Sequence, residues 1–499
     1  MRGARDAPAP IFDVHEEIDA HWPYIQNILH DLRRVSDPGV DEPISKGTNN
    51  DDWEELTSLA IPQTTAQPLT KVVQEAYHIF DHRMRTNHPT FFSFIPSNST
   101  ELSWLGDILV SAFNAHTGGR IASAGPCGVE TALVGWLASK INFPSTAGGL
   151  FVSGGSMANL MAMIIARDQV LPRGARSRGV IYVGDQVHYS ISKAARVLGF
   201  GEDQVCQVKC NASFQTMPQD LQRQIRRDKQ TGLIPFLVVA TFGCTETGAI
   251  DPIDEISKIV SGEGLWLHVD GAFGASVALS SSRQEVASVL GLAHSVSWDA
   301  HKWLFQTYGC GMLLVHDKNK LVSSFHSKAD IIDREGRLEP DIGEFGDFGI
   351  ELTRPSRAMR LWFTFRVLGE ERIGTWIDHG PDLTETIQSC LEERPCWEIV
   401  SRASLGTLNF RYNPGGMTEE ALAKVNEQIR QAMLASNTAA LMTTKIQGKL
   451  ALRICCITTH LAREHAVNLV RALDQTARAE YERQQHPLQT SICRSPEMT

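Results

Sequence analysis

The sequence lacks a long apolar run, an excess of basic residues and a dense cysteine pattern. Nowhere do about 18 apolar residues follow one another, and the first thirty contain no signal-peptide core, so we expect no membrane span. The net charge of −10 disfavours nucleic acid and anionic membranes, since both select basic partners. Ten scattered cysteines indicate reduced thiols and a cytoplasmic location. We predict no metal site.

What is present is an ordinary globular composition, with 42% hydrophobic and 21% charged residues. A chain of 499 residues exceeds the roughly 250–300 at which one hydrophobic core stops growing, so at least two structural units are expected. Residues 1–85 are interpreted as an N-terminal arm that needs another surface, because within 1–60 only 12–35 has helical spacing. A large domain is predicted over 86–365, a small domain over 366–485 and a tail over 486–499.

Between about 100 and 315, short apolar runs alternate with helical segments such as 156–168 and 217–229. The predicted strands are 149–153, 179–184, 204–209, 235–241, 265–270 and 310–316. Such alternation predicts an α/β fold with a mainly parallel sheet, whose ligands bind at the carboxyl ends of the strands. A helix at 359–368 leads to an α+β unit with an amphipathic helix around 422–429, strands near 440–457 and a helix from about 459.

Lys302 lies in residues 297–304 (Ser-Trp-Asp-Ala-His-Lys-Trp-Leu), just before the glycine-rich residues 308–311. A lysine that forms a Schiff base must be neutral part of the time, which a partly desolvated site among aromatic and apolar residues favours. The alternative is a surface lysine whose stem lies over Trp303.

Asp270 ends an apolar run and is followed by the small residues Gly271 and Ala272. A buried carboxylate there can keep the pyridine nitrogen of a cofactor protonated, and small neighbours let a flat ring approach the backbone. The alternative is an ordinary helix cap or turn residue.

Two further segments follow predicted strands. In residues 153–159 (Ser-Gly-Gly-Ser-Met-Ala-Asn), Gly155 and Ser156 open a helix whose N–H groups suit a phosphate, although Ser156 could simply be an N-cap. In residues 185–190 (Asp-Gln-Val-His-Tyr-Ser), His188 could stack on a cofactor ring and relay protons, or be structural.

In this order, these segments resemble the group II decarboxylases of amino acids, which depend on pyridoxal 5′-phosphate (PLP). The family includes the aromatic-L-amino-acid, glutamate, histidine and cysteine sulfinate decarboxylases, and the similarity runs from about Asn87 to about Ala479. It implies the type I PLP-dependent (aspartate aminotransferase-like) fold, with a mainly parallel seven-stranded sheet and a small C-terminal α+β domain. It also implies a homodimer with the active site at the interface, which would give the arm its surface.

The resemblance also implies residue roles. Lys302 is the Schiff-base lysine, Asp270 the pyridinium partner, and His188 the stacking residue and proton relay. The other expected cofactor contacts are Ser97, Gly155, Ser156, Thr245, Ala272, Asp299 and His301. On the substrate side are Phe94, Ile331 and Arg453, of which the arginine matches one associated with the substrate carboxylate or the loop above it.

Ile331 departs from the family pattern. Counting back from the segment 354–362, it stands where the family carries a loop tyrosine that protonates the carbanion left after CO₂ leaves. Isoleucine has no proton to donate, and no tyrosine lies between Tyr308 and Tyr412. Losing a general acid costs about 10²–10⁴ in rate at the step it serves. Either His188 or a water supplies the proton and an amine forms, or O₂ reacts and an aldehyde, ammonia and peroxide result.

We therefore predict an L-amino-acid decarboxylase that forms an amine. An aromatic or other apolar substrate is favoured because residues 94–96 (Phe-Ile-Pro) resemble the aromatic branch. The alternative is decarboxylation-dependent oxidative deamination by an aldehyde synthase. A further alternative is a PLP-binding homologue that does not decarboxylate or is regulatory.

Overall fold

The chain divides into two compact units, Met1–His88 and Pro89–Thr499. The computed structural model describes residues 21–485 except 37, 38, 40, 48, 63, 97, 327–343 and 460. The boundaries proposed at residues 85 and 365 stay predictions.

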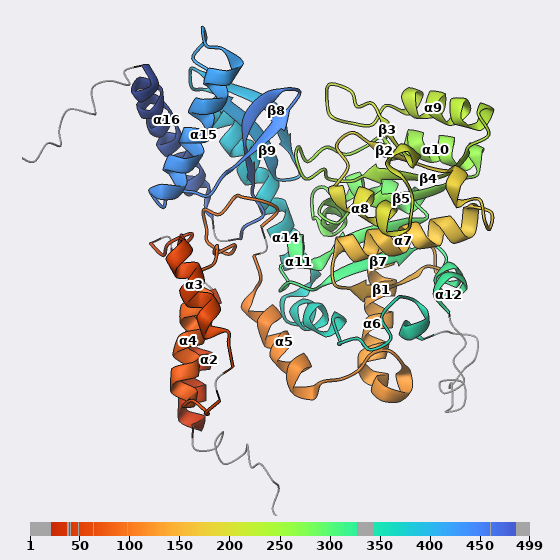
Figure 1. Ribbon diagram of the computed structural model, residues 1–499, viewed down its shortest axis with the longest axis horizontal. Helices are drawn as coiled ribbons and strands as arrows, with labels where there is room; N and C mark the ends of the chain where they lie inside the picture. The colour runs from red at the N-terminus through yellow and green to blue at the C-terminus, as the bar shows by residue number, and fades with distance from the viewer. Residues whose placement is uncertain are drawn as a thin grey trace, which may run out of the picture. The chain divides into compact units, whose positions relative to one another are not determined.

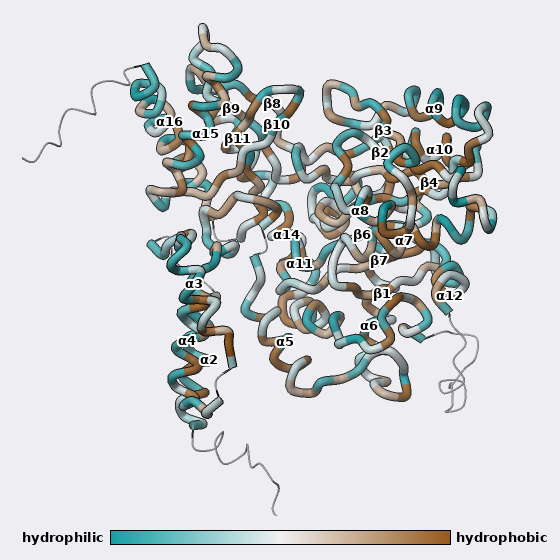
Figure 2. The backbone as a smooth tube through the Cα atoms, in the orientation of Figure 1, coloured by the Kyte–Doolittle hydropathy of each residue, from teal (hydrophilic) through white to brown (hydrophobic). Residues whose placement is uncertain are grey.

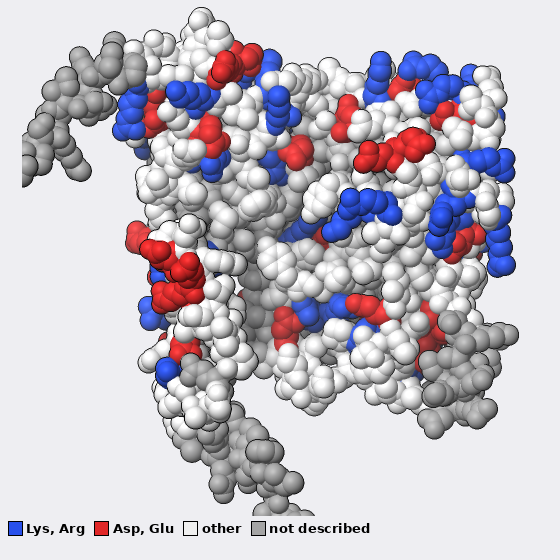
Figure 3. Space-filling model, in the orientation of Figure 1, with Lys and Arg blue, Asp and Glu red and all other residues white. Residues whose placement is uncertain are grey.

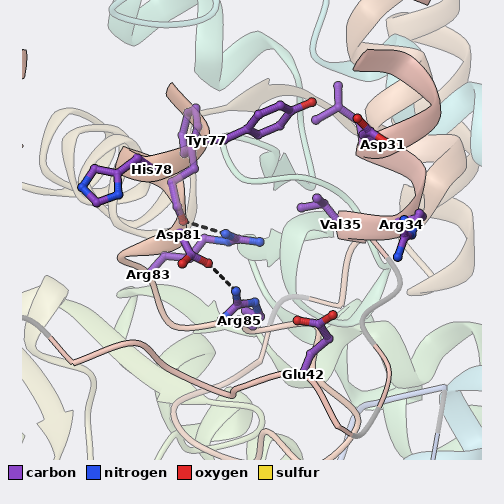
Figure 4. Close-up of a pocket in the computed structure, with 11 residues that line it drawn as sticks. Asp31, Arg34, Val35, Glu42, Tyr77, His78, Asp81, Arg83 and Arg85 are labelled. Atoms are coloured by element: carbon purple, nitrogen blue, oxygen red, sulfur yellow. Dashed lines mark hydrogen bonds and ion pairs between the residues drawn. The ribbon is translucent and has the colours of Figure 1, made fainter. Parts of the chain in front are cut away.

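The first unit contains the helices α2 (Trp22–Ser36), α3 (Asn50–Leu59) and α4 (Leu69–Asp81). In the described part of this unit, α3 and α4 bury no residue completely. Trp53, Ile61 and Phe80 are 65%, 69% and 66% exposed. The unit therefore leaves apolar surface uncovered. The unit also contains a cavity of about 710 Å³. Figure 4 shows side chains that line it, among them Asp81, to which the Arg85 guanidinium donates across 2.6 Å.

The second unit is built on a seven-stranded sheet in the order β1-β7-β6-β5-β4-β2-β3 (Figure 1). Strands β2 to β6 pair in parallel, whereas β7 is antiparallel to both of its neighbours. The predicted α/β class and mainly parallel seven-stranded sheet are confirmed. The strands are β1 (Gly148–Val152), β2 (Gly179–Gly184), β3 (Val205–Val208), β4 (Ile234–Thr241), β5 (Trp266–Asp270), β6 (Ser295–Asp299) and β7 (Gly311–Val315).

Helices cover both faces of this sheet. Those of the second unit are α5 (Glu101–Phe113), α6 (Arg120–Lys140), α7 (Gly155–Val170), α8 (Tyr189–Val197), α9 (Pro218–Gln230), α10 (Ile253–Glu263), α11 (Ala300–Trp303), α12 (Asn319–Phe325), α14 (Ala358–Glu392), α15 (Glu419–Ala435) and α16 (Arg463–Gln485).

Alternate side chains of each strand pack on opposite layers. On β2, Val180 and Tyr182 join the core formed with α6, α9 and α10, whereas Ile181 and Val183 join the core formed with α7, α8 and α12. A strand buried on both faces is a continuous apolar run in sequence, which is why β2 could be predicted. Figure 2 shows these apolar strands in brown and the outer face of α9 in teal. Figure 3 shows basic side chains gathered over α9, with acidic ones among them.

A four-stranded antiparallel sheet in the order β10-β11-β9-β8 forms the C-terminal part of this unit. Its core is packed against α14, α15 and α16, and Figure 1 shows the two last helices beside it. The α+β prediction for this region is confirmed. The strands are β8 (Trp397–Ser404), β9 (Thr407–Tyr412), β10 (Met442–Ile446) and β11 (Lys449–Cys455).

Strands β6, β8 and β9 were not predicted. β6 reads Ser-Val-Ser-Trp-Asp and β9 carries Thr407, Asn409 and Arg411, so both look polar although every residue in them is buried. β8 has only one buried residue in eight and so gives no apolar run. In the described residues, no helix combines the length and apolarity that a membrane crossing needs.

Candidate active site

A cavity of about 320 Å³ lies where β4, β5 and β6 reach their carboxyl ends. Polar side chains from these ends and from the starts of α7 and α8 surround it. We call it the site cavity. Its lining residues are Ser153, Gly154, Gly155, Ser156, Met157, Asn159, Gln186, His188, Ser190, Thr241, Gly243, Thr245, Asp270, Ala272, Phe273, Asp299, His301 and Lys302.

The site cavity brings together most of the residues singled out from the sequence. All three predicted catalytic residues line it, and so do the predicted cofactor contacts that the structure describes: Gly155, Ser156, His188, Thr245, Asp270, Ala272, Asp299, His301 and Lys302. Ser97 and Ile331 lie outside the described residues. Phe94 and Arg453 are described but do not belong to the lining.

Lys302 is held in the site cavity by a carboxylate from the same turn. Its Nζ lies 3.2 Å from Oδ2 of Asp299, and the lysine side chain is only 21% exposed. Trp303 points elsewhere, since it is fully buried and stacks on Phe273 with ring centroids 4.9 Å apart. The alternative of a surface lysine lying over Trp303 is therefore wrong.

Asp270 ends β5 and accepts three hydrogen bonds from neutral donors. These come from Asn159 Nδ2 at 2.9 Å, Ser297 Oγ at 3.0 Å and the Ala272 N–H at 3.1 Å. Burial by itself would raise the pKa of Asp270, but the positive charge of Lys302 and the two nearby histidines hold it below the ordinary value. The bond to Ala272 is a local turn contact, so Asp270 is both a turn residue and a buried anion in the site cavity.

The start of α7 leaves its first N–H groups without a side-chain cap. The N-cap is Gly154, which excludes Ser156 as the cap. Gly155 has room for no side chain, because a Cβ would stand 2.9 Å from Oδ2 of Asp299 and 3.1 Å from Cβ of Ala272. Uncapped N–H groups at the start of a 16-residue helix provide an anion site where they line a cavity.

His188 caps α8 and also lines the site cavity. Its Nδ1 accepts from the Ser190 N–H at 3.3 Å and lies 2.8 Å from Ser190 Oγ. Burial, the largest effect, lowers the pKa of His188 below its ordinary value of 6.5. The imidazole is therefore neutral near pH 7. The structural and the cavity-lining readings of this histidine both hold.

Arg453 donates to two backbone carbonyls, while its Nη2 is buried without a hydrogen-bond partner among the described residues. Only 2% exposed, it donates from Nε to Thr245 O at 2.8 Å and from Nη1 to Phe94 O at 2.6 Å. Phe94 itself has a left-handed backbone, with φ of 56°, and is 50% exposed. The arginine therefore fixes the backbone at Phe94. Both roles expected for it, at the substrate carboxylate or at the loop above it, stay predictions. Contact of either residue with substrate stays a prediction.

Several lining residues were missed. Asn159 was the most accessible of them to prediction, because it stands one helical turn after Gly155 on the side that faces the sheet. Ser190 and Gln186 lie in the segment that contains His188, but neither has a distinctive spacing. Thr241 ends β4, and Gly243 and Phe273 follow strand ends, but none of the three has a chemical signal of its own.

The residues present fit PLP. Lys302 offers an amine for the aldehyde, Asp270 a buried anion for the pyridinium nitrogen, and the start of α7 an anion site for the phosphate. Oδ1 of Asp299 is buried and has no partner among the described residues, as expected beside a ligand. The larger cavity of the first unit does not offer this set, because Asp81 there is neutralised by Arg85 and Lys46 at 2.6 and 3.5 Å.

A mainly parallel sheet with a partly buried lysine and a buried aspartate at the carboxyl ends of its strands defines a type I PLP-dependent enzyme. Residues 52–413 match the model of the pyridoxal-dependent decarboxylase conserved domain. The chain belongs to this decarboxylase family, and its cofactor is PLP.

Known relatives cover most of the chain. The aromatic-L-amino-acid decarboxylase of Bacillus atrophaeus is 33% identical over 431 residues, which are 86% of this chain and 89% of that protein. The phenylacetaldehyde synthase of Arabidopsis thaliana is 27% identical over 76% of this chain and 79% of its own. The crystal structure of Oryza sativa TDC with PLP and tryptamine superimposes with a TM-score of 0.85 at 22% identity, covering 95% of this chain and 99% of that one.

Proposed function

We propose that this enzyme decarboxylates an L-amino acid with an aromatic or other apolar side chain and releases the amine and CO₂. The observation that carries the proposal is the meeting of Lys302, Asp270 and His188 in one site cavity. The similarity to an aromatic-L-amino-acid decarboxylase over 86% of the chain supports the substrate class.

The positions of these residues support the roles that we propose for them. When bound, PLP supplies the electron sink that takes up the electron pair released as CO₂ leaves. Lys302 would hold the aldehyde carbon of PLP before substrate binds, and Asp299 keeps the lysine in place. Asp270 stabilises a proton on the pyridine nitrogen, because its charge is buried and it accepts only from neutral donors. His188 offers a neutral imidazole beside the reacting atoms.

The test uses purified PLP-loaded protein and a panel of L-amino acids under air. We expect yellow protein, CO₂ release from aromatic or apolar substrates, and one amine for each CO₂. Lys302→Ala should abolish both the yellow lysine-bound absorbance and CO₂ release, while the exposed lysine variant Lys193→Ala should retain both. An unchanged yellow species in Lys302→Ala would overturn the cofactor assignment. Protein that binds PLP but releases no CO₂ would favour a non-decarboxylating or regulatory homologue.

A second candidate function is an aldehyde synthase. The described residues that line the site cavity include no tyrosine, and the sequence places Ile331 where the family carries its loop tyrosine. One relative is a phenylacetaldehyde synthase. Peroxide and ammonia formed in step with CO₂, with O₂ consumed, would identify this route. Amine formation that continues unchanged under nitrogen and without peroxide would exclude it.

We also propose that the protein is a cytoplasmic homodimer. The support is the apolar surface that Trp53, Ile61 and Phe80 leave exposed on the first unit, since isolated units of this kind need a partner surface. Light scattering should give about twice the 55.1 kDa chain mass. A mass equal to one chain would contradict the dimer.

A further inference from the structure

A chain of buried polar side chains connects the interior of the sheet with the site cavity. It runs from β5 and β6 through Asn159 of α7 to the start of α8. Its inner members are fully or almost fully buried: Trp266, His268, Ser295, Asn159 and Ser190 are 5%, 0%, 0%, 1% and 2% exposed. Polar groups buried to this degree must find partners, so the direction of each hydrogen bond can be worked out.

Asn159 determines which group donates and which accepts in each of these hydrogen bonds. One end of its amide lies 2.9 Å from Asp270 Oδ2 and 3.0 Å from Ser190 Oγ. An ionised carboxylate can only accept, so the NH₂ group must face Asp270 and the amide oxygen must face the other way. That oxygen lies 2.9 Å from Nε2 of His268, which must therefore carry a proton.

The hydrogen bonds among Trp266, Ser295 and His268 agree with this assignment. Burial lowers the pKa of His268 to about 4, so the ring is neutral at pH 7 and its Nδ1 must accept. Among the described residues, its donor is Ser295 Oγ at 2.9 Å, since the neighbouring Ser295 carbonyl cannot donate. Ser295 Oγ in turn accepts from Trp266 Nε1, also at 2.9 Å. An indole nitrogen only donates, so the direction is the same at this end.

The hydrogen bonds from Asn159 through Ser190 to His188 are donated in the same direction. Ser190 Oγ accepts from Asn159, so its own proton is free for His188 Nδ1 at 2.8 Å. The Ser190 N–H points at the same nitrogen from 3.3 Å. His188 Nδ1 therefore accepts, and the proton of a neutral ring must be on Nε2.

We propose that Asn159 is a positioning residue: through Ser190 it fixes His188 in the Nε2–H tautomer, while it holds Asp270 as an acceptor for the cofactor nitrogen. Every proton in the series Trp266, Ser295, His268, Asn159, Ser190, His188 points towards the site cavity. His188 thus presents a hydrogen-bond donor and no acceptor to a ligand. If the proposed function holds, a lone pair of the substrate, such as a carboxylate oxygen, is what this donor meets.

The decisive measurement is ¹⁵N NMR of histidine-labelled protein, with and without PLP and without substrate, because nitrogen shifts distinguish the two tautomers. We expect Nε2–H for His188 in the wild type. Ser190→Ala and Asn159→Leu should shift the ring towards a mixture of tautomers. Asn159→Leu should also weaken PLP binding by at least about tenfold, because Asp270 loses a buried hydrogen bond.

A matched control separates this role from general destabilisation. Asn426 is another fully buried asparagine with three hydrogen bonds, to Tyr412 N, Tyr412 O and Leu422 O, in the C-terminal sheet region. Asn426→Leu should lower the melting temperature and leave both the His188 tautomer and PLP affinity unchanged. His268→Gln, whose amide can still donate to Asn159, should preserve the tautomer better than His268→Leu.

Two outcomes would overturn the proposal: Nδ1–H on His188 in the wild type, or an unchanged tautomer in both Ser190→Ala and Asn159→Leu. If Asn159→Leu does not fold, the milder Ser190→Ala still decides. Because the tautomer is measured without substrate, failure of this proposal is distinguishable from failure of the proposed function. Nε2–H in a protein that releases no CO₂ would contradict only the latter.

Discussion

Two buried carboxylates, Asp270 and Glu130, carry their charge in opposite ways. Glu130 of α6 forms a two-bond pair with Arg354, at 2.7 and 3.0 Å, and both side chains are completely buried. Its Oε1 also accepts the Phe151 N–H, and Arg354 donates to Phe151 O. Asp270 instead takes hydrogen bonds from neutral donors and opens onto the site cavity. One charge is neutralised inside the fold and fastens β1, whereas the other is kept available for a ligand.

The largest expected effect is the loss of activity when the charge of Asp270 is removed. Asp270→Asn keeps the shape but removes the anion that holds the cofactor nitrogen protonated. We expect CO₂ release to fall by about 10²–10⁴, the range for losing a group that controls a proton. The melting temperature of the protein without PLP should fall only modestly, because the lowered pKa shows that the fold favours the carboxylate and one of its three donors would face the new NH₂ group. A large loss of stability with activity retained would reverse the two roles.

Changing the Glu130–Arg354 pair should instead lower stability and leave turnover unchanged. Glu130→Gln leaves Arg354 buried without a counter-charge, which costs about 3–5 kcal/mol of folding stability. The turnover of the protein that remains folded should be unchanged. The double variant Glu130→Leu with Arg354→Met removes both charges and should recover part of the loss in a denaturation experiment. If the double variant is no more stable than Glu130→Gln, the pair does not act as a neutralised unit.

The pH dependence of stability tests the interior end of the polar chain. The pKa of His268 is lowered from 6.5 to about 4 in the fold. Between pH 6.5 and about pH 4, His268 binds a proton in the unfolded chain but not in the folded protein. The free energy of unfolding therefore falls as the pH is lowered through this range. The contribution is about 3 kcal/mol. His268→Gln should lose less stability than the wild type between pH 6.5 and pH 4, and parallel curves would contradict the assignment.

The same contrast explains what could be predicted from sequence. Lys302, Asp270 and Gly155 follow apolar strands or precede helices, so the pattern alone assigns them to one sheet edge. Ser295 and Ser297 could not be recognised, because β6 looks polar until the partners of its hydroxyl groups are known. Asn409 and Arg411 hid β9 for the same reason. Glu130 and Arg354 are more than two hundred positions apart, and no local sequence pattern predicts that they pair.

The smallest effect is expected from adding one methyl group beside the open charge. A Cβ at Gly155 would approach Asp299 Oδ2 to 2.9 Å and Ala272 Cβ to 3.1 Å, so the start of α7 must shift away from the anion it is placed to bind. Gly155→Ala should weaken PLP binding by about tenfold, which is roughly 1.4 kcal/mol, as measured by absorbance titration. Gly135 in the interior of α6 provides the matched helical control, since a Cβ there meets nothing within 4 Å. Gly135→Ala should leave PLP affinity unchanged and stabilise the helix by up to about 1 kcal/mol. Equal PLP affinity in both variants would show that the close packing at Gly155 serves the fold rather than the phosphate.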